Sequence, residues 1–386
     1  MSTMSIGLSM FGAMLVLMAV RVPIAISMFV PGAVGYMALA GWLPLLSHLK
    51  GAVYSRVSIY DLSVIPLFML MGAFAVHGGL SKALFDFANA LLGRFKGGMA
   101  MAGVLACAAF GSISGSTVAT TATIAQVAYP EMRRINYSGR LATAALATGG
   151  TMGVLLPPSV TLMVYAILTE QNITKMFLAA YIPALLAAVG YLIAIAVIVR
   201  IHPDQAPQAK AATASELMTT AINVWPIAAI FLVVFGGIYG GVFTATEGAA
   251  IGNVLTFAIT LLRREMTFDK LVASIRTTAQ TSGMIFLIFI GADMINASLA
   301  LSQLPAQLAD MVGHLQISPL VVMAGIMIFY IILGCVMDEM SMILLTVPTL
   351  FPVILGMDFF GLNPSDKALW FGILILTVCE IGMIFP

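Results

Sequence analysis

The sequence predicts an all-α integral membrane protein built as an inverted repeat, with two re-entrant helical hairpins and two broken helices. Three observations lead to this fold class. Of the 386 residues, 61% are hydrophobic and 9% are charged, whereas a soluble domain has roughly 25% charged residues. Apolar windows recur along the whole chain. Two segments, 111–130 and 334–352, interrupt these windows, and each begins with glycine and ends with proline.

The apolar windows predict the membrane helices, because about 20 apolar residues cross roughly 30 Å of hydrocarbon. We expect these helices at 5–20, 22–41, 62–78, 140–168, 177–199, 222–240, 246–262 and 278–300. The first run lacks a basic region and a small-residue cleavage site, so we expect it to be retained as the first membrane helix. The amphipathic segments 81–98 and 302–316 are predicted to lie along the membrane interface as arms.

Basic residues at both ends of the interval 97–132 predict the first re-entrant hairpin. Arg94 and Lys96 precede it, and Arg133 and Arg134 follow it. Because lysine and arginine mark the cytoplasmic side, this segment must enter the membrane and return. Its turn should fall at "SISGST", where non-helical backbone requires surrounding protein or a water-filled cavity.

The opposite charge pattern around the interval 318–357 predicts a second hairpin that enters from outside. The segment before it contains no lysine or arginine, and the segment after it contains only Lys367. The same rule places the N-terminus outside and the polar, Pro/Ala-rich linker after residue 200 in the cytoplasm.

Two sets of equivalent positions indicate an internal duplication. Gly111 and Gly334 are offset by 223 residues, and the prolines that end the two segments are offset by 222. Gly153 and Gly382 are offset by 229. A near-constant offset in the same order is typical of a repeat. By our count the first copy crosses the membrane an odd number of times, so the second is inverted, which is typical of secondary transporters.

The same correspondence leaves the segment 159–200 without a counterpart in this sequence. We therefore expect the natural chain to continue for roughly 40 residues beyond Pro386, about one and a half membrane spans by helix rise.

A cation site is predicted where the first hairpin turn meets the first broken helix. The turn offers four hydroxyls, and the helix "ATGGTMGVLLPPS" is interrupted by glycines and by two adjacent prolines. Helix C-terminal carbonyls and hydroxyl oxygens favour a hard cation such as Na⁺, and helix N-termini favour a carboxylate. Close helix packing by small residues is the alternative explanation.

The mirrored site would bring three acidic residues into play: Asp338, Glu339 and Glu380. Intramembrane acids are functional candidates, but Glu339 and Glu380 also fit solvent-facing surface positions. Asp293 lies inside an apolar helix and needs a partner or a wet cavity; Asn296 is one turn away. Asp293 fits a proton carrier and a helix-packing hydrogen bond equally well.

Six stretches of this sequence resemble one known family, the large membrane (M) subunit of dicarboxylate-type tripartite ATP-independent periplasmic (TRAP) transporters. They cover nearly the whole chain in order and are "IPLFMLMGAF", "SISGSTVATTATI", "GVLLPPSVTLMVYA", "GIYGGVFTATEGAA", "MDEMSMILLTVPTLFPV" and "EIGMIFP". Three positions depart from the family pattern: Asn136 replaces the usual glycine, Ala245 the usual proline, and Phe385 a frequent threonine.

The resemblance implies an elevator-type transporter of the ion-transporter superfamily in the bacterial inner membrane, with a periplasmic N-terminus. It implies two protein partners, a small four-helix membrane (Q-type) subunit and a periplasmic substrate-binding (P-type) protein. The cargo would be a small carboxylate, C4-dicarboxylate-like, coupled to Na⁺, with no organic cofactor and no enzyme activity. The net charge of +1 gives no basis for nucleic acid binding.

On this resemblance we assign site residues. The Na⁺ ligands are expected at Ser112, Ser114, Gly153, Leu156 and Pro158 for the first site, and at Gly334, Asp338 and Gly382 for the second. Substrate contacts are expected at Ser116, Thr117, Thr120, Ser159 and Thr346.

The resemblance also divides the chain into scaffold and transport parts. We expect scaffold helices and an arm at 1–96 and again at 222–317, separated from the first transport part by a cytoplasmic linker at 201–221. The transport domain would consist of 97–200, with the first hairpin and broken helix, and 318–386, with the second.

Two other functions fit parts of the pattern. A stand-alone divalent-anion/Na⁺ symporter of the same inverted architecture would work without a soluble partner. An intramembrane protease would need a serine near a base, or two apposed aspartates. No histidine lies at helical spacing from Ser114, so the protease is the remote alternative.

Overall fold

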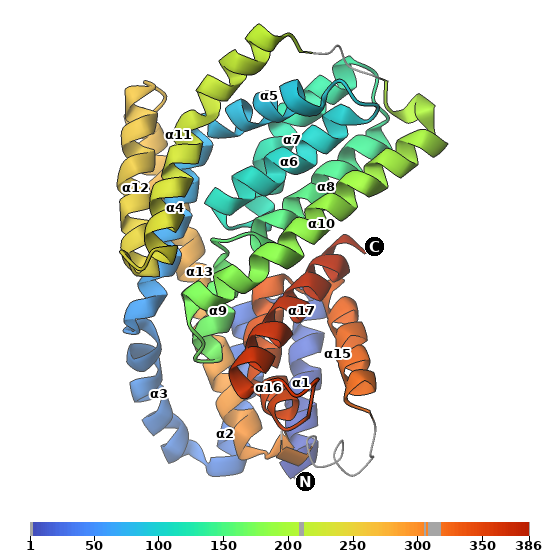
Figure 1. Cartoon of the computed structure of the whole chain (residues 1–386). Helices are drawn as coiled ribbons and strands as arrows, with labels where there is room; N and C mark the ends of the chain where they lie inside the picture. Colours follow the sequence, from blue (N-terminus) through green and yellow to red (C-terminus); the bar gives the residue numbers. More distant parts are fainter. Residues whose placement is uncertain (1–2, 208–211, 305, 308–317, 386) are drawn as a thin grey trace. The chain divides into compact units, whose positions relative to one another are not determined.

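The structure is a computed structural model (Figure 1) that describes residues 3–207, 212–304, 306–307 and 318–385. Within these ranges the secondary structure is helical and contains no strand. The chain divides into two compact units, each with its own packing. Unit 1 comprises Met1–Leu62, Val164–Asn172 and Gln280–Pro386, and unit 2 comprises Ser63–Met163 and Ile173–Ala279.

Unit 2 contains the first hairpin. Its helices are α4 (Val64–His77), α5 (Leu80–Leu92), α6 (Gly98–Ser114), α7 (Thr117–Arg134), α8 (Gly139–Leu155), α10 (Ile173–Ile201), the 3₁₀ turn η2 (Pro203–Gln205), α11 (Ala214–Tyr239), α12 (Ala245–Leu262) and the beginning of α13 (Phe268–Leu301). In Figure 1, α6, α7, α8 and α10 run beside one another, and α6 packs against α5, α7 and α8.

Unit 1 contains the second hairpin. Its helices are α1 (Thr3–Ala19), α2 (Ile24–Ala40), α3 (Trp42–Val57), most of the 3₁₀ turn η1 (Tyr60–Ser63), most of α9 (Val160–Leu168), the rest of α13, α15 (Pro319–Gly334), α16 (Glu339–Leu355) and α17 (Pro364–Ile384). Close glycine contacts hold α2 against α13, because a Cβ added to Gly32 would lie 2.7 Å from the Ile295 Cα.

The predicted membrane helices correspond to observed helices. Seven helical spans of the described residues are long and apolar enough to cross a membrane, when α8 and α9 are counted as one span. The 140–168 window is divided into α8 and α9, as expected for a broken helix. The first arm is α5, whereas the second arm, 302–316, lies mostly outside the described residues.

Several boundaries differ from the sequence prediction. Helix α11 begins at Ala214, inside the predicted linker, because Thr213 and Glu216 form a capping box: the Thr213 Oγ1 accepts from the Glu216 N–H at 3.2 Å, and the Thr213 N–H donates to Glu216 Oε2 at 2.7 Å. Helix α13 begins at Phe268 rather than 278. Helix α3 was not predicted, because its sequence is interrupted by His48 and Lys50 and lacks a long apolar run.

The three departures from the family pattern have clear backbone settings. Asn136 adopts a left-handed conformation with φ 62°, which glycine favours and asparagine tolerates. Ala245 is the first residue of α12, a position where proline is favoured because its missing N–H is not needed. Phe385 follows α17 in an extended conformation with an exposed side chain.

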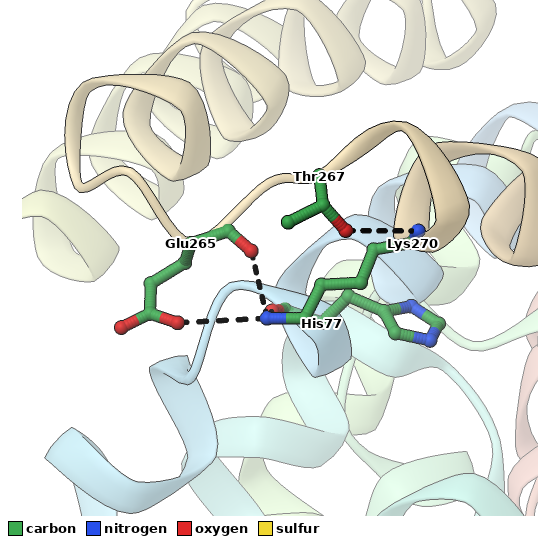
Figure 2. Close-up of polar contacts among 4 residues, drawn as sticks. All are labelled: His77, Glu265, Thr267 and Lys270. Atoms are coloured by element: carbon green, nitrogen blue, oxygen red, sulfur yellow. Dashed lines mark hydrogen bonds and ion pairs between the residues drawn. The ribbon is translucent and has the colours of Figure 1, made fainter.

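The turn between α12 and α13 is tied to the end of α4 (Figure 2). The Lys270 Nζ donates to the Glu265 carbonyl oxygen at 2.7 Å and to the His77 carbonyl oxygen at 3.3 Å, and it pairs with the Glu265 carboxylate at 3.5 Å. The His77 carbonyl belongs to the last turn of α4, where a cation is favoured by the helix dipole. These contacts of Lys270 hold the C-terminus of α4, from which the chain continues into α5.

Candidate functional site

The first hairpin turns within two residues. Helix α6 ends at Ser114, Gly115 adopts the left-handed conformation with φ 60°, and Ser116 caps α7 by accepting from the Ala119 N–H at 3.4 Å. A left-handed glycine and a serine cap are the residues that such a tight helix-to-helix turn requires. The predicted turn at "SISGST" is confirmed.

Hydroxyl groups gather inside this turn. The hydroxyls of Ser114 and Thr120 are 2.6 Å apart, and both side chains are buried. The Thr117 Oγ1 is enclosed and has no hydrogen-bond partner among the described residues. Ser112, by contrast, donates to the Ala109 carbonyl of its own helix at 2.8 Å. The turn therefore presents Ser114, Thr117 and Thr120 more directly than Ser112.

The interruption between α8 and α9 leaves carbonyl groups without helical donors. Pro157 and Pro158, joined by a cis peptide bond, occupy the positions four residues after Gly153 and Val154. Because proline has no N–H, the carbonyls of Gly153 and Val154 lack their normal i+4 partners. Ser159 then begins α9, its hydroxyl accepting from the Leu162 N–H at 3.1 Å.

The hairpin turn and the interrupted helix are in direct backbone contact. A Cβ added to Gly153 would lie 2.8 Å from Thr120 Oγ1 and 3.1 Å from the Ser116 carbonyl oxygen. A Cβ added to Gly115 would lie 2.8 Å from the Pro158 carbonyl oxygen. The structure thus brings together most of the first predicted Na⁺ set with the predicted substrate residues Ser116 and Thr120.

Leu156 contributes differently from the other members of that set. Its side chain packs with Met152, Leu155 and Ala184 in an apolar cluster, and its N–H donates to the Met152 carbonyl at 3.0 Å. Any contact between Leu156 and a cation would therefore involve its carbonyl oxygen.

Helix termini of both signs meet at this place. The C-termini of α6 and α8 carry partial negative charge, and the N-termini of α7 and α9 carry partial positive charge. No group of three His, Cys, Asp or Glu residues that could hold a metal occurs in the described parts of the chain. The donors available here are carbonyl and hydroxyl oxygens, which suit a hard cation.

The second hairpin repeats this arrangement in unit 1. A Cβ added to Gly334 would lie 2.8 Å from the Gly382 Cα, and one added to Gly382 would lie 2.9 Å from the Ile331 carbonyl oxygen. Gly111 meets Gly153 in the same close manner in the first hairpin. Each hairpin therefore packs by paired glycines against the helix predicted to be broken, and within the described residues the break itself is seen in the first half, whereas α17 is continuous.

The polar residues of the second hairpin are engaged within the protein. Asp338 is exposed and caps α16: its carboxylate accepts from the Ser341 N–H at 3.3 Å and from the Ser341 hydroxyl at 2.5 Å. Thr346 donates to the Met342 carbonyl at 2.7 Å and bonds the Tyr330 hydroxyl, with both side chains buried. Roles for Asp338 in cation binding and for Thr346 in substrate binding stay predictions.

Three further acidic residues were candidates from the sequence: Asp293, Glu339 and Glu380. Asp293 pairs with His48 Nε2 at 3.2 Å, and the His48 ring stacks on Tyr36 with centroids 5.3 Å apart. Glu380 is buried and Glu339 is half-buried. Sequence reasoning missed His48, because it lies 245 residues from its partner.

Comparison with known proteins gives one family. The model of the DctM component of the tripartite ATP-independent periplasmic transporter matches residues 11–386. The C4-dicarboxylate TRAP transporter large permease protein DctM of Pseudomonas aeruginosa is 32% identical over 329 residues, which cover 85% of this chain and 75% of that protein. The isethionate TRAP transporter permease protein DctMQ of Oleidesulfovibrio alaskensis is 28% identical over 381 residues, covering 98% of this chain and 58% of that protein.

A solved structure has a similar fold. The crystal structure of the YdaH transporter of Alcanivorax borkumensis, described as revealing an unusual topology, aligns with a TM-score of 0.54 and 14% identity. The alignment covers 89% of this chain and 77% of that one. The predicted all-α membrane fold with hairpins and interrupted helices is confirmed at this level.

Proposed function

The chain belongs to the DctM family, the large permease subunit of tripartite ATP-independent periplasmic transporters, and we propose that it moves a small organic acid anion across the membrane together with Na⁺. The proposal is more specific than the family in three respects: the coupling ion, the chemical class of the cargo and the movement of the transport domain. Each is supported by a different feature.

The coupling to Na⁺ rests chiefly on the carbonyls of Gly153 and Val154. The two prolines that follow α8 remove their helical donors, and the hairpin turn brings the Ser116 carbonyl close to Gly153. Carbonyl oxygens at a helix C-terminus, beside buried hydroxyls, bind Na⁺ by replacing its hydration oxygens. In the second half, the equivalent Na⁺ site would lie where Gly334 packs against Gly382.

An anionic cargo is supported by the two helix N-termini at the first site. The N-termini of α7 and α9 point partial positive charge and free N–H groups toward a ligand. The cargoes named for two of the relatives, C4-dicarboxylates and isethionate, are small acid anions, although a third relative is named for ectoine and 5-hydroxyectoine. We therefore assign Ser116, Thr117 and Ser159 to the carboxylate or sulfonate group of the cargo.

The proposed movement is an elevator in which 97–200 and 318–386 move against a scaffold made of 1–96 and 222–317. Glycine contacts between backbone segments make each hairpin and its interrupted helix a rigid pair. A rigid pair that carries the ligand oxygens suits movement as a body.

Two partners are proposed to complete the transporter in the bacterial inner membrane. One is a small four-helix membrane subunit, consistent with the combined designation DctMQ of a longer relative. The other is a periplasmic protein that delivers the cargo to the outer face, where we also place the N-terminus.

The test measures uptake into proteoliposomes that are assembled with all three components and have a higher Na⁺ concentration outside than inside. Replacing external Na⁺ by choline, with the membrane potential clamped, should abolish uptake of the binding protein's ligand. Equal uptake in both media would reject Na⁺ coupling. Uptake without the binding protein would instead favour the stand-alone symporter.

A further inference from the structure

An apolar groove in unit 2 has not been assigned a function above, although one predicted Na⁺ residue, Ser112, lines it. We name it the α6–α11 groove; it encloses about 770 Å³ and is lined by side chains of α5, α6 and α11, with Tyr181 of α10 at one end. Phe87, Ala109, Ala228 and Phe231 are representative of its walls. Its volume lies within the range of small-molecule sites, roughly 300–1,000 Å³.

The polar groups that line the groove have partners within the protein. Ser112 donates to the Ala109 carbonyl at 2.8 Å, and the hydroxyls of Tyr181 and Tyr239 bond each other at 3.1 Å. A polar ligand or a cluster of water molecules would find few hydrogen bonds here. The groove therefore suits a hydrocarbon.

The wall of the groove is longer than the hydrocarbon depth of one leaflet, so it can hold one lipid tail. Its wall follows α11 from Val224 to Tyr239, a distance of about 22 Å by helix rise. One leaflet supplies about 15 Å of the roughly 30 Å hydrocarbon core. Helix α11 is highly apolar and only 33% of its most apolar window is buried within the protein, so most of this helix is available for contact with lipid.

One basic residue lies at the end of the groove at which α11 begins, and two more follow α5. Arg263 donates to the carbonyl oxygen of Asn223, the residue next to Val224. Arg94 and Lys96 follow α5, whose Leu84 and Phe87 line the groove. These cations would attract the phosphate of a lipid headgroup at the side that basic residues mark as cytoplasmic.

A corresponding cavity occurs in unit 1, lined by α1, α13, α15 and α16 and enclosing about 180 Å³. Two of its lining residues fall at the repeat offset from residues of the α6–α11 groove: Leu8 and Phe231 differ by 223, as do Ala106 and Phe329. The duplication thus produces two related apolar cavities. Each lies between the first helix of one half and the first hairpin helix of the other half.

We propose that the α6–α11 groove is a binding site for one acyl chain of a phospholipid from the cytoplasmic leaflet. The chain would fill the space between α6 of the first hairpin and α11, while its phosphate lies near Arg263. The proposal requires membrane insertion but neither Na⁺ coupling nor any particular cargo, so failure of either of these parts of the proposed function leaves it standing.

Gly236 offers a direct test, because it lines the groove and a Cβ added there would meet no atom within 4 Å. Gly236→Leu should fold normally and occupy the space of the acyl chain. Gly190→Leu is the matched control, since Gly190 is an exposed glycine of α10 with the same open surroundings and lies outside the groove.

The experiment uses the chain with its small membrane subunit in vesicles of phosphatidylethanolamine and phosphatidylglycerol, with a trace of phosphatidylglycerol carrying a diazirine near the end of one acyl chain. After illumination, labelled peptides are identified by mass spectrometry. Label should concentrate on α6 and α11, fall about tenfold in Gly236→Leu, which corresponds to about 1.4 kcal/mol, and stay unchanged in Gly190→Leu.

Three results would overturn the proposal. Label spread evenly over the exposed faces of α10 and α11 would show ordinary annular lipid. Equal labelling of wild type and Gly236→Leu would show that the groove is not the site. Labelling that occurs only without the small membrane subunit would assign the groove to a helix of that partner.

Discussion

Asn296 on α13 donates a hydrogen bond of 3.2 Å from Nδ2 to the Leu344 carbonyl oxygen on α16. Leu344 needs this donor because Pro348, four residues later, has no N–H to offer. A side chain outside the hairpin thus replaces the missing backbone bond inside it. The Asn296 Oδ1 is enclosed and has no hydrogen-bond partner among the described residues.

This relationship predicts a coupled pair. Asn296→Leu should lower the free energy of unfolding by about 1–3 kcal/mol, because it leaves a buried carbonyl unsatisfied. In a Pro348→Ala background, residue 348 regains its N–H and the same change should cost much less. Thermal unfolding in detergent measures the double-mutant cycle. Additive effects of the two substitutions would contradict the interpretation.

The sequence allowed the hairpins and interrupted helices to be located because their determinants are local. The left-handed Gly115, the cap at Ser116 and the prolines after α8 act within a few residues of themselves. The repeat offset then predicted a mirrored site that joins the segments of Gly334 and Gly382, and the structure brings these glycines together as it does Gly111 and Gly153. Each of these features depends on backbone geometry.

Side-chain partners were less predictable, because they depend on tertiary packing. Asp293 pairs with His48 of α3, a helix that has no clear apolar pattern. Thr346, assigned to the substrate, bonds the Tyr330 hydroxyl within its own hairpin. Ser112, assigned to Na⁺, bonds its own helix. Residue type and spacing indicated polar character at these positions but did not identify the partner.

Ser114→Ala should weaken the response to Na⁺. Its hydroxyl lies 2.6 Å from that of Thr120, inside the hairpin turn. Loss of one oxygen near a cation should raise the Na⁺ concentration for half-maximal uptake about tenfold, or about 1.4 kcal/mol. Ser9→Ala, at an exposed serine that donates to its own helix, is the control. An unchanged Na⁺ titration would remove Ser114 from the site.

Gly153→Ala should disturb the same site by separating the interrupted helix from the hairpin. The new methyl group would lie 2.8 Å from Thr120 Oγ1 and 3.1 Å from the Ser116 carbonyl oxygen, and overpacking of this kind costs about 1–3 kcal/mol. Both the unfolding midpoint and the Na⁺ dependence of uptake should change. Gly12→Ala has open space around its Cβ and should change neither.

Lys367→Met should destabilise the second hairpin. The buried Lys367 ammonium donates to the Leu355 carbonyl at 3.2 Å and to the Met357 carbonyl at 2.6 Å, at the C-terminus of α16. Methionine fills a similar volume but provides no donor and no charge, so we expect a loss of about 1–3 kcal/mol. Proteolysis between α16 and α17 should accelerate. Lys50→Met, at an exposed lysine, controls for the loss of charge.

Asp86→Asn should stabilise unit 2 at neutral pH. Burial on α5 raises the pKa of the Asp86 carboxyl; nearby Lys82 lowers this pKa, and Glu131 raises it. Because the folded pKa exceeds the unfolded one, the contribution of Asp86 to stability is fully present below the unfolded pKa of about 3.9. It is lost as pH rises through the folded pKa. Asparagine avoids this loss.

The unfolding midpoint of Asp86→Asn should therefore exceed that of the wild type at pH 7.5, and the difference should shrink as the pH falls toward the unfolded pKa. Asp204→Asn, at an exposed aspartate outside the helices of the membrane, should show no such dependence. Glu131→Gln should reproduce part of the gain, because it removes a charge that repels the Asp86 carboxylate. A midpoint of Asp86→Asn below that of the wild type at pH 7.5, approaching it on acidification, would mean that Asp86 is stabilised as the anion, with Lys82 outweighing burial.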